Sequence, residues 1–395
     1  MLKQSNPLQI YLDHGATTPV RTEVIEAMLP YWTDVYGNPS SVHRFGQLAR
    51  KGLQYARTTI AELINCRTNE IIFVGCGSES DNLALRGVMW SARKFGIGNH
   101  LITSAIEHKA VLDTASQLRD LAGFDITILP VDEFGQISLD DLTSSIRPDT
   151  VLISLMAANN EIGTIQPIEE IGAIAQERGV LFHTDAIQAA AMRDWDLNRM
   201  PFDLVSMAPH KFYGPKGIGI LYARQNIELV STLTGGGQEN GRRAGTENVA
   251  FAVGTAEALR LALEERQENT IHYQALRNQL IDGIIESFSD DCKLTGHPTN
   301  RLPNNASFTF RNISGNDLIF HLDVAGISAS SGSACLTGDP EPSRVLKAIG
   351  LSDEWTKGGL RLTVGKQNNE DQIEYVLKVL PDIVNRLRQI KVQVA

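Results

Sequence analysis

Short apolar runs alternate with helix-like amphipathic segments between about residues 70 and 225 of this 395-residue chain. Such alternation is typical of strand and helix units packed around a largely parallel sheet. The runs predicted to be strands lie at 70–74, 100–104, 125–131, 150–156, 180–183, 202–206 and 217–222, and the predicted helices between them lie at 80–94, 109–122, 139–146 and 168–178. We therefore expect an α/β fold with a mainly parallel, seven-stranded sheet.

The C-terminal part of the chain has a different pattern of helical and apolar segments. A long helical stretch at 247–277 precedes the apolar runs 306–310 and 360–364, which are predicted strands of a smaller α+β domain. A chain of this length also exceeds one compact core of typical size. We predict a large domain over 16–255 and a small domain over 256–395, joined by the N-terminal segment 1–15.

The charge and the cysteine pattern limit the partners. A net charge of −10 argues against a nucleic-acid surface or an anionic membrane surface, and it favours small molecules. No apolar run approaches the ~20 residues that span a bilayer, and the first residues lack the apolar core of a secretion signal. The four cysteines contain no C-x-x-C pair, and no metal ligands are assigned. We expect a protein of the reducing cytoplasm.

Lys211 lies in the sequence SMAPHKFYGPKG, directly after the apolar run 202–205. A lysine at the end of a buried strand can be partly desolvated, which lowers its pKa and frees the amine to form a Schiff base with an aldehyde cofactor. That is the chemistry of a pyridoxal phosphate enzyme. A solvated surface charge is the alternative, because most lysines are exposed.

Asp185 ends another apolar run, in the sequence VLFHTDAIQ. A carboxylate in this place suits a pyridine nitrogen that must stay protonated for the ring to act as an electron sink. The alternative is a helix N-cap, for which aspartate is a favoured residue. Asp185 and Lys211 together indicate pyridoxal phosphate more strongly than either residue alone.

A glycine-containing turn, VGCGSESDN at 74–82, links a predicted strand to a helix. Backbone N–H groups at the helix start, aided by the Ser78 hydroxyl, would hold a phosphate, and Gly77 allows a tight turn. Glu79 sits oddly close to an anion in this interpretation. Glycine and serine are also common in ordinary turns of this kind.

Two further polar residues follow predicted strands. His108 would stack its imidazole on a cofactor ring or move protons, although a histidine in the first turn of a helix is also common. Asn160, in the run NNEIG, would donate to a phenolate oxygen or to a substrate carboxylate. Asparagine and glycine are equally routine turn formers.

These motifs together resemble the cysteine desulfurases, the NifS and IscS branch of the class V aminotransferases, which depend on pyridoxal phosphate. The resemblance extends from YLDHGATTP at 11–19 to LRLT at 360–363, nearly the whole chain. Its most specific parts are GNPSS at 37–41, NNEIG at 159–163, HTDAIQ at 183–188, the stretch around Lys211 and SSGSAC at 330–335. The resemblance implies the aminotransferase fold of type I.

The resemblance also implies roles for single residues. Lys211 would be the Schiff-base lysine, Asp185 would pair with the pyridine nitrogen, and His108 would lie over the ring. The other cofactor-binding residues would be Gln188 and Asn160 near the phenolic oxygen, and Gly77, Ser78 and His210 at the phosphate. Thr246, in RAGT, matches a threonine that reaches the phosphate from a partner subunit, which implies a homodimer.

Arg361 and Cys335 carry the expected substrate chemistry. Arg361 matches the arginine that binds the substrate carboxylate, beside Asn160, and a guanidinium fork suits that task because it contacts both oxygens. Cys335 matches the nucleophile, and its small polar surroundings favour an exposed thiol that can ionise. A surface arginine and an inert core cysteine are the alternatives.

Three departures from the family pattern concern the cofactor and the acceptor. Ala208 and Pro209 stand where the family has a serine and a small residue, which removes one hydroxyl contact to the phosphate. Cys76 replaces a glycine, so the backbone there must avoid conformations that only glycine accepts. The chain stops at Ala395 without the extension that scaffold-docking members use, which argues against sulfur delivery to an iron-sulfur scaffold.

We therefore expect a homodimeric pyridoxal phosphate enzyme that converts L-cysteine to L-alanine and holds the sulfur as a persulfide on Cys335, with His108 as proton donor. The loop after Cys335 resembles that of long-loop members, which present the persulfide to acceptor proteins for iron-sulfur cluster assembly or thiolation. The alternatives are a cysteine, cystine or selenocysteine lyase, a small amino-acid transaminase, and a noncatalytic sulfur carrier.

Overall fold

The computed structural model describes residues 9–331 and 342–394, without the side chains of 390–394. Within these residues, seven strands form one sheet in the order β2-β8-β7-β6-β5-β3-β4. They are β2 (Ile71–Val74), β3 (His100–Ser104), β4 (Asp125–Leu129), β5 (Thr150–Ser154), β6 (Leu181–Asp185), β7 (Leu204–Met207) and β8 (Gly219–Ala223). Only β8 pairs antiparallel, with β7 and β2. The prediction of a mainly parallel seven-stranded sheet is confirmed.

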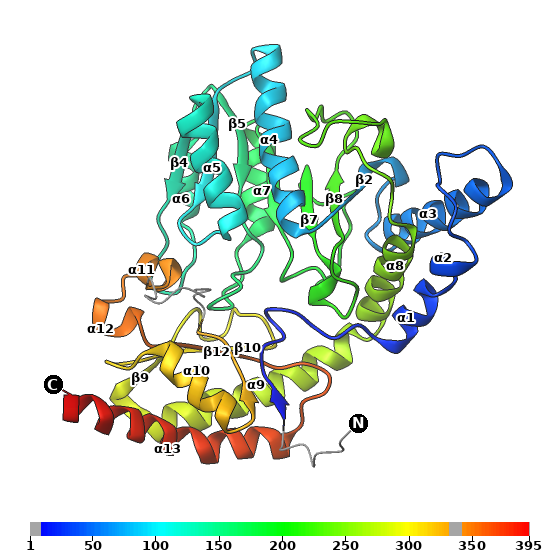
Figure 1. Ribbon diagram of the computed structural model, residues 1–395. Helices are drawn as coiled ribbons and strands as arrows, with labels where there is room; N and C mark the ends of the chain where they lie inside the picture. Colours follow the sequence, from blue (N-terminus) through cyan, green and yellow to red (C-terminus); the bar gives the residue numbers. More distant parts are fainter. Residues whose placement is uncertain (1–8, 332–341, 395) are drawn as a thin grey trace.

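Helices cover both faces of this sheet, because each strand turns successive side chains to opposite sides. Ile71 and Phe73 face one core, and Ile72 and Val74 face the other. The first core includes α3 (Arg44–Leu63), α6 (Leu139–Ser145), α7 (Ile168–Glu177) and α8 (Val249–Glu264), and the second includes α4 (Gly77–Phe95) and α5 (Lys109–Ala122). Figure 1 shows α4 and α5 running along the sheet.

A second layer of structure lies below this sheet in Figure 1. Its strands β9 (Cys292–Leu294), β10 (Asn305–Phe310) and β12 (Gly359–Thr363) form an antiparallel sheet in the order β12-β10-β9. The helices α9 (Arg266–Phe288), α10 (Gly315–Val324) and α13 (Glu370–Val394) contribute to a separate apolar core with these strands.

The N-terminal strand joins this second core rather than the large sheet. Strand β1 (Ile10–Tyr11) pairs in parallel with β11 (Ile327–Ser328), and the side chains of Ile10 and Leu12 are buried with α9 and α13. The chain then passes Thr363 of β12, where the Gly15 amide donates to Thr363 Oγ1 at 2.7 Å. Residues 13–16 therefore run from the second core to the carboxyl ends of β6 and β7, where Gly15 contacts Gln188 and Lys211.

Short elements complete the described fold. They are α1 (Thr22–Met28), α2 (Pro30–Thr33), α11 (Arg344–Ala348) and α12 (Asp353–Thr356), with 3-10 turns η1 (Thr68–Glu70), η2 (Pro209–Lys211), η3 (Gln238–Gly241) and η4 (Ser289–Asp291). The predicted helical stretch 247–277 divides at Glu265 into α8 and α9. The predicted domain boundary at 255 and 256 falls inside α8, and the division stays a prediction, as does the cytoplasmic location.

None of the helices described here has the length and apolar character needed to cross a bilayer.

Candidate active site

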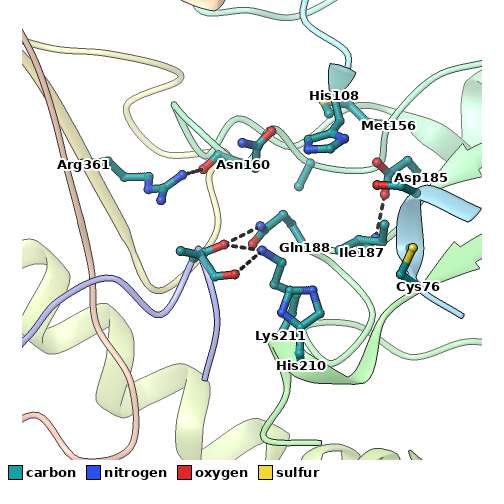
Figure 2. Close-up of a pocket in the computed structure, with 15 residues that line it drawn as sticks. Cys76, His108, Met156, Asn160, Asp185, Ile187, Gln188, His210, Lys211 and Arg361 are labelled. Atoms are coloured by element: carbon teal, nitrogen blue, oxygen red, sulfur yellow. Dashed lines mark hydrogen bonds between the residues drawn. The ribbon is translucent and has the colours of Figure 1, made fainter. Parts of the chain in front are cut away.

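A cavity of about 300 Å³ opens at the carboxyl ends of the parallel strands, where ligands bind in sheets of this kind. It is lined by Gly15, Ala16, Cys76, Gly77, Ser78, His108, Met156, Ala158, Asn160, Asp185, Ile187, Gln188, His210, Lys211 and Arg361 (Figure 2). Most residues predicted for the site are therefore brought together from separate strands. Thr246 does not line the cavity, and Cys335 lies outside the described residues.

Lys211 ends the η2 turn that follows β7, and its amine is held by the N-terminal segment. Nζ donates to the backbone oxygens of Gly15 and Ala16, each at 2.7 Å (Figure 2). Burial lowers the pKa of Lys211 to about 8, and the positive charge of Arg361 acts in the same direction. An amine with this pKa is partly neutral near pH 8 and can act as a nucleophile or a base.

Asp185 is the last residue of β6 and is nearly buried beside the cavity. Its Oδ1 accepts a hydrogen bond from the Ile187 amide at 2.9 Å. Burial raises the pKa of Asp185, whereas that hydrogen bond and the charges of His108 and Lys211 lower it. A carboxylate in this setting can pair with a protonated ring nitrogen.

The turn before α4 presents a helix N-terminus to the cavity. Gly77 and Ser78 are the first residues of α4, where backbone N–H groups have no partner within the helix. A side chain at Gly77 would come within 2.4 Å of Ile187 Cδ1, and one at Gly219 would come within 2.7 Å of the Cys76 backbone. The turn is therefore packed directly against β8.

Cys76 caps α4 in an extended conformation, with φ −170° and ψ 173°. The Glu79 amide donates to Cys76 Sγ at 3.4 Å. Because this backbone conformation is open to any residue, the replacement of the family glycine by Cys76 introduces no strain.

Glu79 lies near the expected phosphate, but its carboxylate is already paired. Its Oε2 accepts from the Gly75 amide at 2.6 Å, and its Oε1 accepts from Arg243 Nε at 2.8 Å. The guanidinium neutralises the acid that seemed out of place in the sequence.

His210 precedes Lys211 and contacts the N-terminal segment, with Nδ1 3.2 Å from Thr17 Oγ1. Burial lowers the pKa of His210 to about 4, with further lowering by Lys211 and Lys216. The ring is therefore neutral at pH 7 and can donate one N–H to an anion.

His108 caps α5 and points its ring into the cavity (Figure 2). Its Nδ1 accepts from the Ala110 amide at 3.1 Å. The hydrogen of a neutral ring must then lie on Nε2, which leaves that atom for stacking contacts or proton transfer.

Arg361 comes from β12 and brings a buried guanidinium to the cavity. Nη2 pairs with Asp13 Oδ1 at 2.8 Å. Nη1 donates to the Asn160 backbone oxygen at 3.0 Å, the contact drawn in Figure 2. Its buried Nε has no hydrogen-bond partner among the residues that the structure describes. A guanidinium carries five N–H donors, so donors remain for a carboxylate ligand.

Several lining groups were not predicted from the sequence. The backbone oxygens of Gly15 and Ala16 hold Lys211, and Gly15 also accepts from Gln188 Nε2 at 2.9 Å. Asp13 orients Arg361. The motif DHGATT signalled this segment, but no side-chain pattern identifies a functional backbone oxygen.

The family model described as aminotransferase class-V matches residues 10–376. The chain belongs to this family. Cysteine desulfurase IscS of Clostridium botulinum strain Hall is 46% identical over 383 residues, which cover 96% of each chain. A solved NifS-like protein superimposes with a TM-score of 0.89 at 36% identity, covering 96% of this chain and 100% of that one. A solved structure titled SspA in complex with cysteine is also 36% identical, with a TM-score of 0.77, covering 90% of this chain and 99% of that one. The resemblance to cysteine desulfurases is confirmed.

Class-V aminotransferases use pyridoxal phosphate, and the cavity fits this cofactor. Three groups from different elements suit its three parts. The Lys211 amine of lowered pKa suits the aldehyde, the buried Asp185 carboxylate suits the ring nitrogen, and the N-terminus of α4 suits the phosphate. Gly77 lines the cavity and leaves its backbone uncovered there, because a side chain at this position would collide with Ile187.

The Lys211 amine should titrate near pH 8 in the apoenzyme, because burial and Arg361 both destabilise its charged form. Reductive methylation at a series of pH values, with mass spectrometry of the peptide containing Lys211, measures this midpoint. Arg361→Gln removes a positive charge and should move the midpoint to higher pH. A wild-type midpoint above about pH 10, the ordinary range of lysine, would contradict the assignment.

Proposed function

We propose that this chain is a cysteine desulfurase, which converts L-cysteine to L-alanine and keeps the sulfur as a persulfide on Cys335. The observation that carries the proposal is the meeting of Lys211, Asp185 and Arg361 at one cavity, in a chain closely related to IscS. These residues supply a cofactor anchor, a partner for a ring nitrogen and a carboxylate receptor.

Pyridoxal phosphate, when bound, supplies an electron sink that stabilises negative charge at the substrate Cα. Asp185 would hold the ring nitrogen, and the α4 N-terminus, Ser78 and His210 would hold the phosphate. His108 would lie against the ring, and Gln188 and Asn160 would lie near its oxygen. Lys211 would anchor the aldehyde carbon.

Lys211 and His108 are suited to move protons. The pKa of about 8 lets Nζ of Lys211 accept a proton from the substrate Cα and return it later. His108 presents Nε2 to the cavity because its Nδ1 is engaged with the backbone. We assign His108 as the donor to the substrate carbon after the carbon-sulfur bond breaks.

Arg361 would bind the substrate carboxylate through the donors that Asp13 and Asn160 leave unused. Asp13 fixes the plane of the guanidinium, so binding needs little reorganisation. Burial of the Arg361 guanidinium reduces screening by water and so strengthens its attraction for a substrate anion.

Cys335 lies outside the described residues, but both flanks of its segment are anchored beside the site. Ser330 pairs with Arg361 through two backbone hydrogen bonds, of 2.7 and 3.2 Å. Ser343 Oγ donates to Glu161 Oε2 at 2.5 Å, next to Asn160. Cys335 follows Ser330 by five residues, which span at most about 18 Å of extended chain. These anchors support Cys335 as the residue that takes the sulfur.

The proposed reaction transfers one sulfur atom. The Cys335 thiolate attacks the substrate sulfur, a sulfur-sulfur bond forms, and the carbon-sulfur bond breaks with its electron pair going to carbon. Protonation of that carbon gives alanine and leaves the persulfide on the protein. An acceptor protein would then remove the sulfur for iron-sulfur cluster assembly or for thiolation.

The other thiols are less suited to this role. Burial raises the pKa of Cys66 and of Cys292 to about 12, so neither is ionised near neutral pH. Cys76 lines the cavity, but Figure 2 shows it on the side opposite to Arg361, in the turn before α4 that is expected to hold the phosphate.

A homodimer forms the second part of the proposal. Exposed apolar side chains gather on the N-terminal helices and the loop between α2 and α3, with Leu29, Trp32, Tyr36, Val42 and Phe45 each about half exposed or more. Such surfaces are typical of subunit interfaces. Thr246 does not line the cavity of its own chain, in keeping with a contribution to a partner's site.

Cys335→Ser should retain the cofactor and still bind L-cysteine, because Lys211, Asp185 and Arg361 are unchanged. Alanine formation should fall by at least about a thousandfold, because no thiolate is available to take the sulfur. Alanine analysis and mass spectrometry of the protein measure both effects, with Cys76→Ser as the matched control that keeps its activity within about threefold. Rapid alanine formation by Cys335→Ser would contradict the role of Cys335 as sulfur acceptor, and formation of pyruvate in place of alanine would favour a cysteine or cystine lyase.

Arg361→Ala should raise the KM for L-cysteine by about 10- to 100-fold, since the lost charge-assisted hydrogen bonds contribute about 1.5–3 kcal/mol. The absorbance of the bound cofactor should stay unchanged. Arg361→Lys should give an intermediate KM, because it keeps the charge without the fork. A KM within twofold of the wild-type value would remove Arg361 from the substrate site.

Co-expression of Thr246→Ala subunits with Lys211→Ala subunits tests the dimer. If the subunits pair at random, about half of the dimers contain one subunit of each variant, and such a heterodimer has one complete site of two. Activity at limiting cofactor should therefore recover to about a quarter of the wild-type value. Each variant alone should be almost inactive under that condition. No recovery would mean that Thr246 serves its own subunit.

A further inference from the structure

Two buried carboxyl groups lie close to Asp185 without lining the cavity. Asp81 is in the first turns of α4 and is fully buried, and Glu107 lies between β3 and α5 with only 5% of its surface exposed. The function proposed above uses neither group. A buried carboxylate needs a cation or several hydrogen bonds to stay ionised.

Asp81 has little compensation of either kind. Both of its oxygens are buried, and the part of the chain that the structure describes offers them no hydrogen-bond partner of good geometry. The Ser206 hydroxyl, which also contacts Ser80 Oγ at 2.7 Å and His183 Nε2 at 3.0 Å, lowers the pKa of Asp81, but by less than burial raises it. The surroundings therefore favour an uncharged side chain.

Among residues 9–331 and 342–394, the neighbour of Asp81 that could become a cation is His183, whose Nε2 lies 3.7 Å from Asp81 Oδ1. Both nitrogens of this ring contact serine hydroxyls, Nδ1 at 2.8 Å from Ser154 and Nε2 at 3.0 Å from Ser206. Burial lowers the pKa of His183 to about 3, so the ring is neutral at pH 7.

The other titratable groups that act on Asp81 are acids. Burial raises the pKa of Asp81 well above its usual value, and the charges of Asp185 and Glu107 act in the same direction. Burial also raises the pKa of Glu107 to about 8, although its Oε1 accepts from Ser104 Oγ at 2.6 Å and from the Met156 amide at 3.1 Å. The cation Lys211 and the ring of His108 act on Asp185.

We propose that Asp81 is a positioning residue that remains a neutral carboxylic acid at neutral pH, so that Asp185 carries the single negative charge at this end of the site. An ionised Asp81 would place a second negative charge beside Asp185 and favour protonation of Asp185. Asp185 would then lose its attraction for a protonated ring nitrogen. The role toward the cofactor rests on the proposed function, whereas the protonation state is a property of the protein alone.

The pH dependence of stability tests the protonation state in the apoenzyme. A carboxyl group whose pKa is raised by folding binds more protons in the folded state, so the contribution of Asp81 to stability is lost as pH rises above about 4. Asp81→Asn is nearly isosteric with the neutral acid and cannot lose that proton. Its Tm should equal the wild-type Tm near pH 4 and exceed it by about 3 °C or more at pH 8.

Glu239→Gln is the matched control for a buried acid that has partners. Glu239 pairs with Arg57 Nη2 at 2.6 Å and accepts from the Phe73 amide at 3.1 Å, so its amide variant should have a lower Tm than the wild type at pH 7. An Asp81→Asn variant with an unchanged or lower Tm at pH 8 would overturn the proposal. A lower Tm is the result expected if Asp81 and His183 form an ion pair.

Infrared spectroscopy of the wild-type apoenzyme gives a second measurement that needs no stable variant. Labelling with ¹³C-aspartate should shift the carbonyl stretch of a protonated carboxylic acid at pH 7, which separates Asp81 from Glu107. The labelled band should disappear in Asp81→Asn. Its absence from the wild type, or its persistence in the variant, would overturn the proposal. Neither result depends on Cys335 or on alanine formation, so the desulfurase assignment is tested separately.

Discussion

Desolvation at the carboxyl ends of β6 and β7 is the physical constraint on which the site depends. It lowers the pKa of Lys211 and raises that of Asp185, although the two groups carry opposite charges when ionised. Both shifts favour the neutral form, and they are opposed by the mutual attraction of the pair, by the Ile187 amide and His108 at Asp185, and by Asp13 at Lys211. The balance between burial and pairing therefore decides how reactive the amine is and whether the carboxylate keeps its charge.

Local sequence patterns predicted the large sheet well, because each buried parallel strand is a short apolar run bounded by helical periodicity. Strand β3 and helix α5 occur where the pattern placed them. Strands β1 and β11 escaped prediction, because each has two residues and depends on a partner far away in the sequence. The break at Glu265 was also missed, since both flanking segments favour helix.

The site likewise contains residues that the sequence predicts and contacts that only the fold creates. Lys211, Asp185 and Arg361 could be found from the sequence because their chemistry depends on residue type at the end of a strand. The role of the Gly15 backbone oxygen could not be predicted, because every residue has a backbone oxygen and only the fold directs this one toward Lys211. Asp81 stands in the phosphate-turn motif, yet its lack of partners is visible only after α4 packs against the sheet.

The pairing of β1 with β11 has a consequence for how the chain is made. Ile10 leaves the ribosome more than 300 residues before its partner Ile327, a delay of roughly 15 to 60 s at common rates of synthesis. During that interval the first strand has no neighbour, and the carbonyl groups of Gly15 and Ala16 have no fixed position. The large sheet can assemble first, but the enclosure of Lys211 is completed only after translation has almost ended.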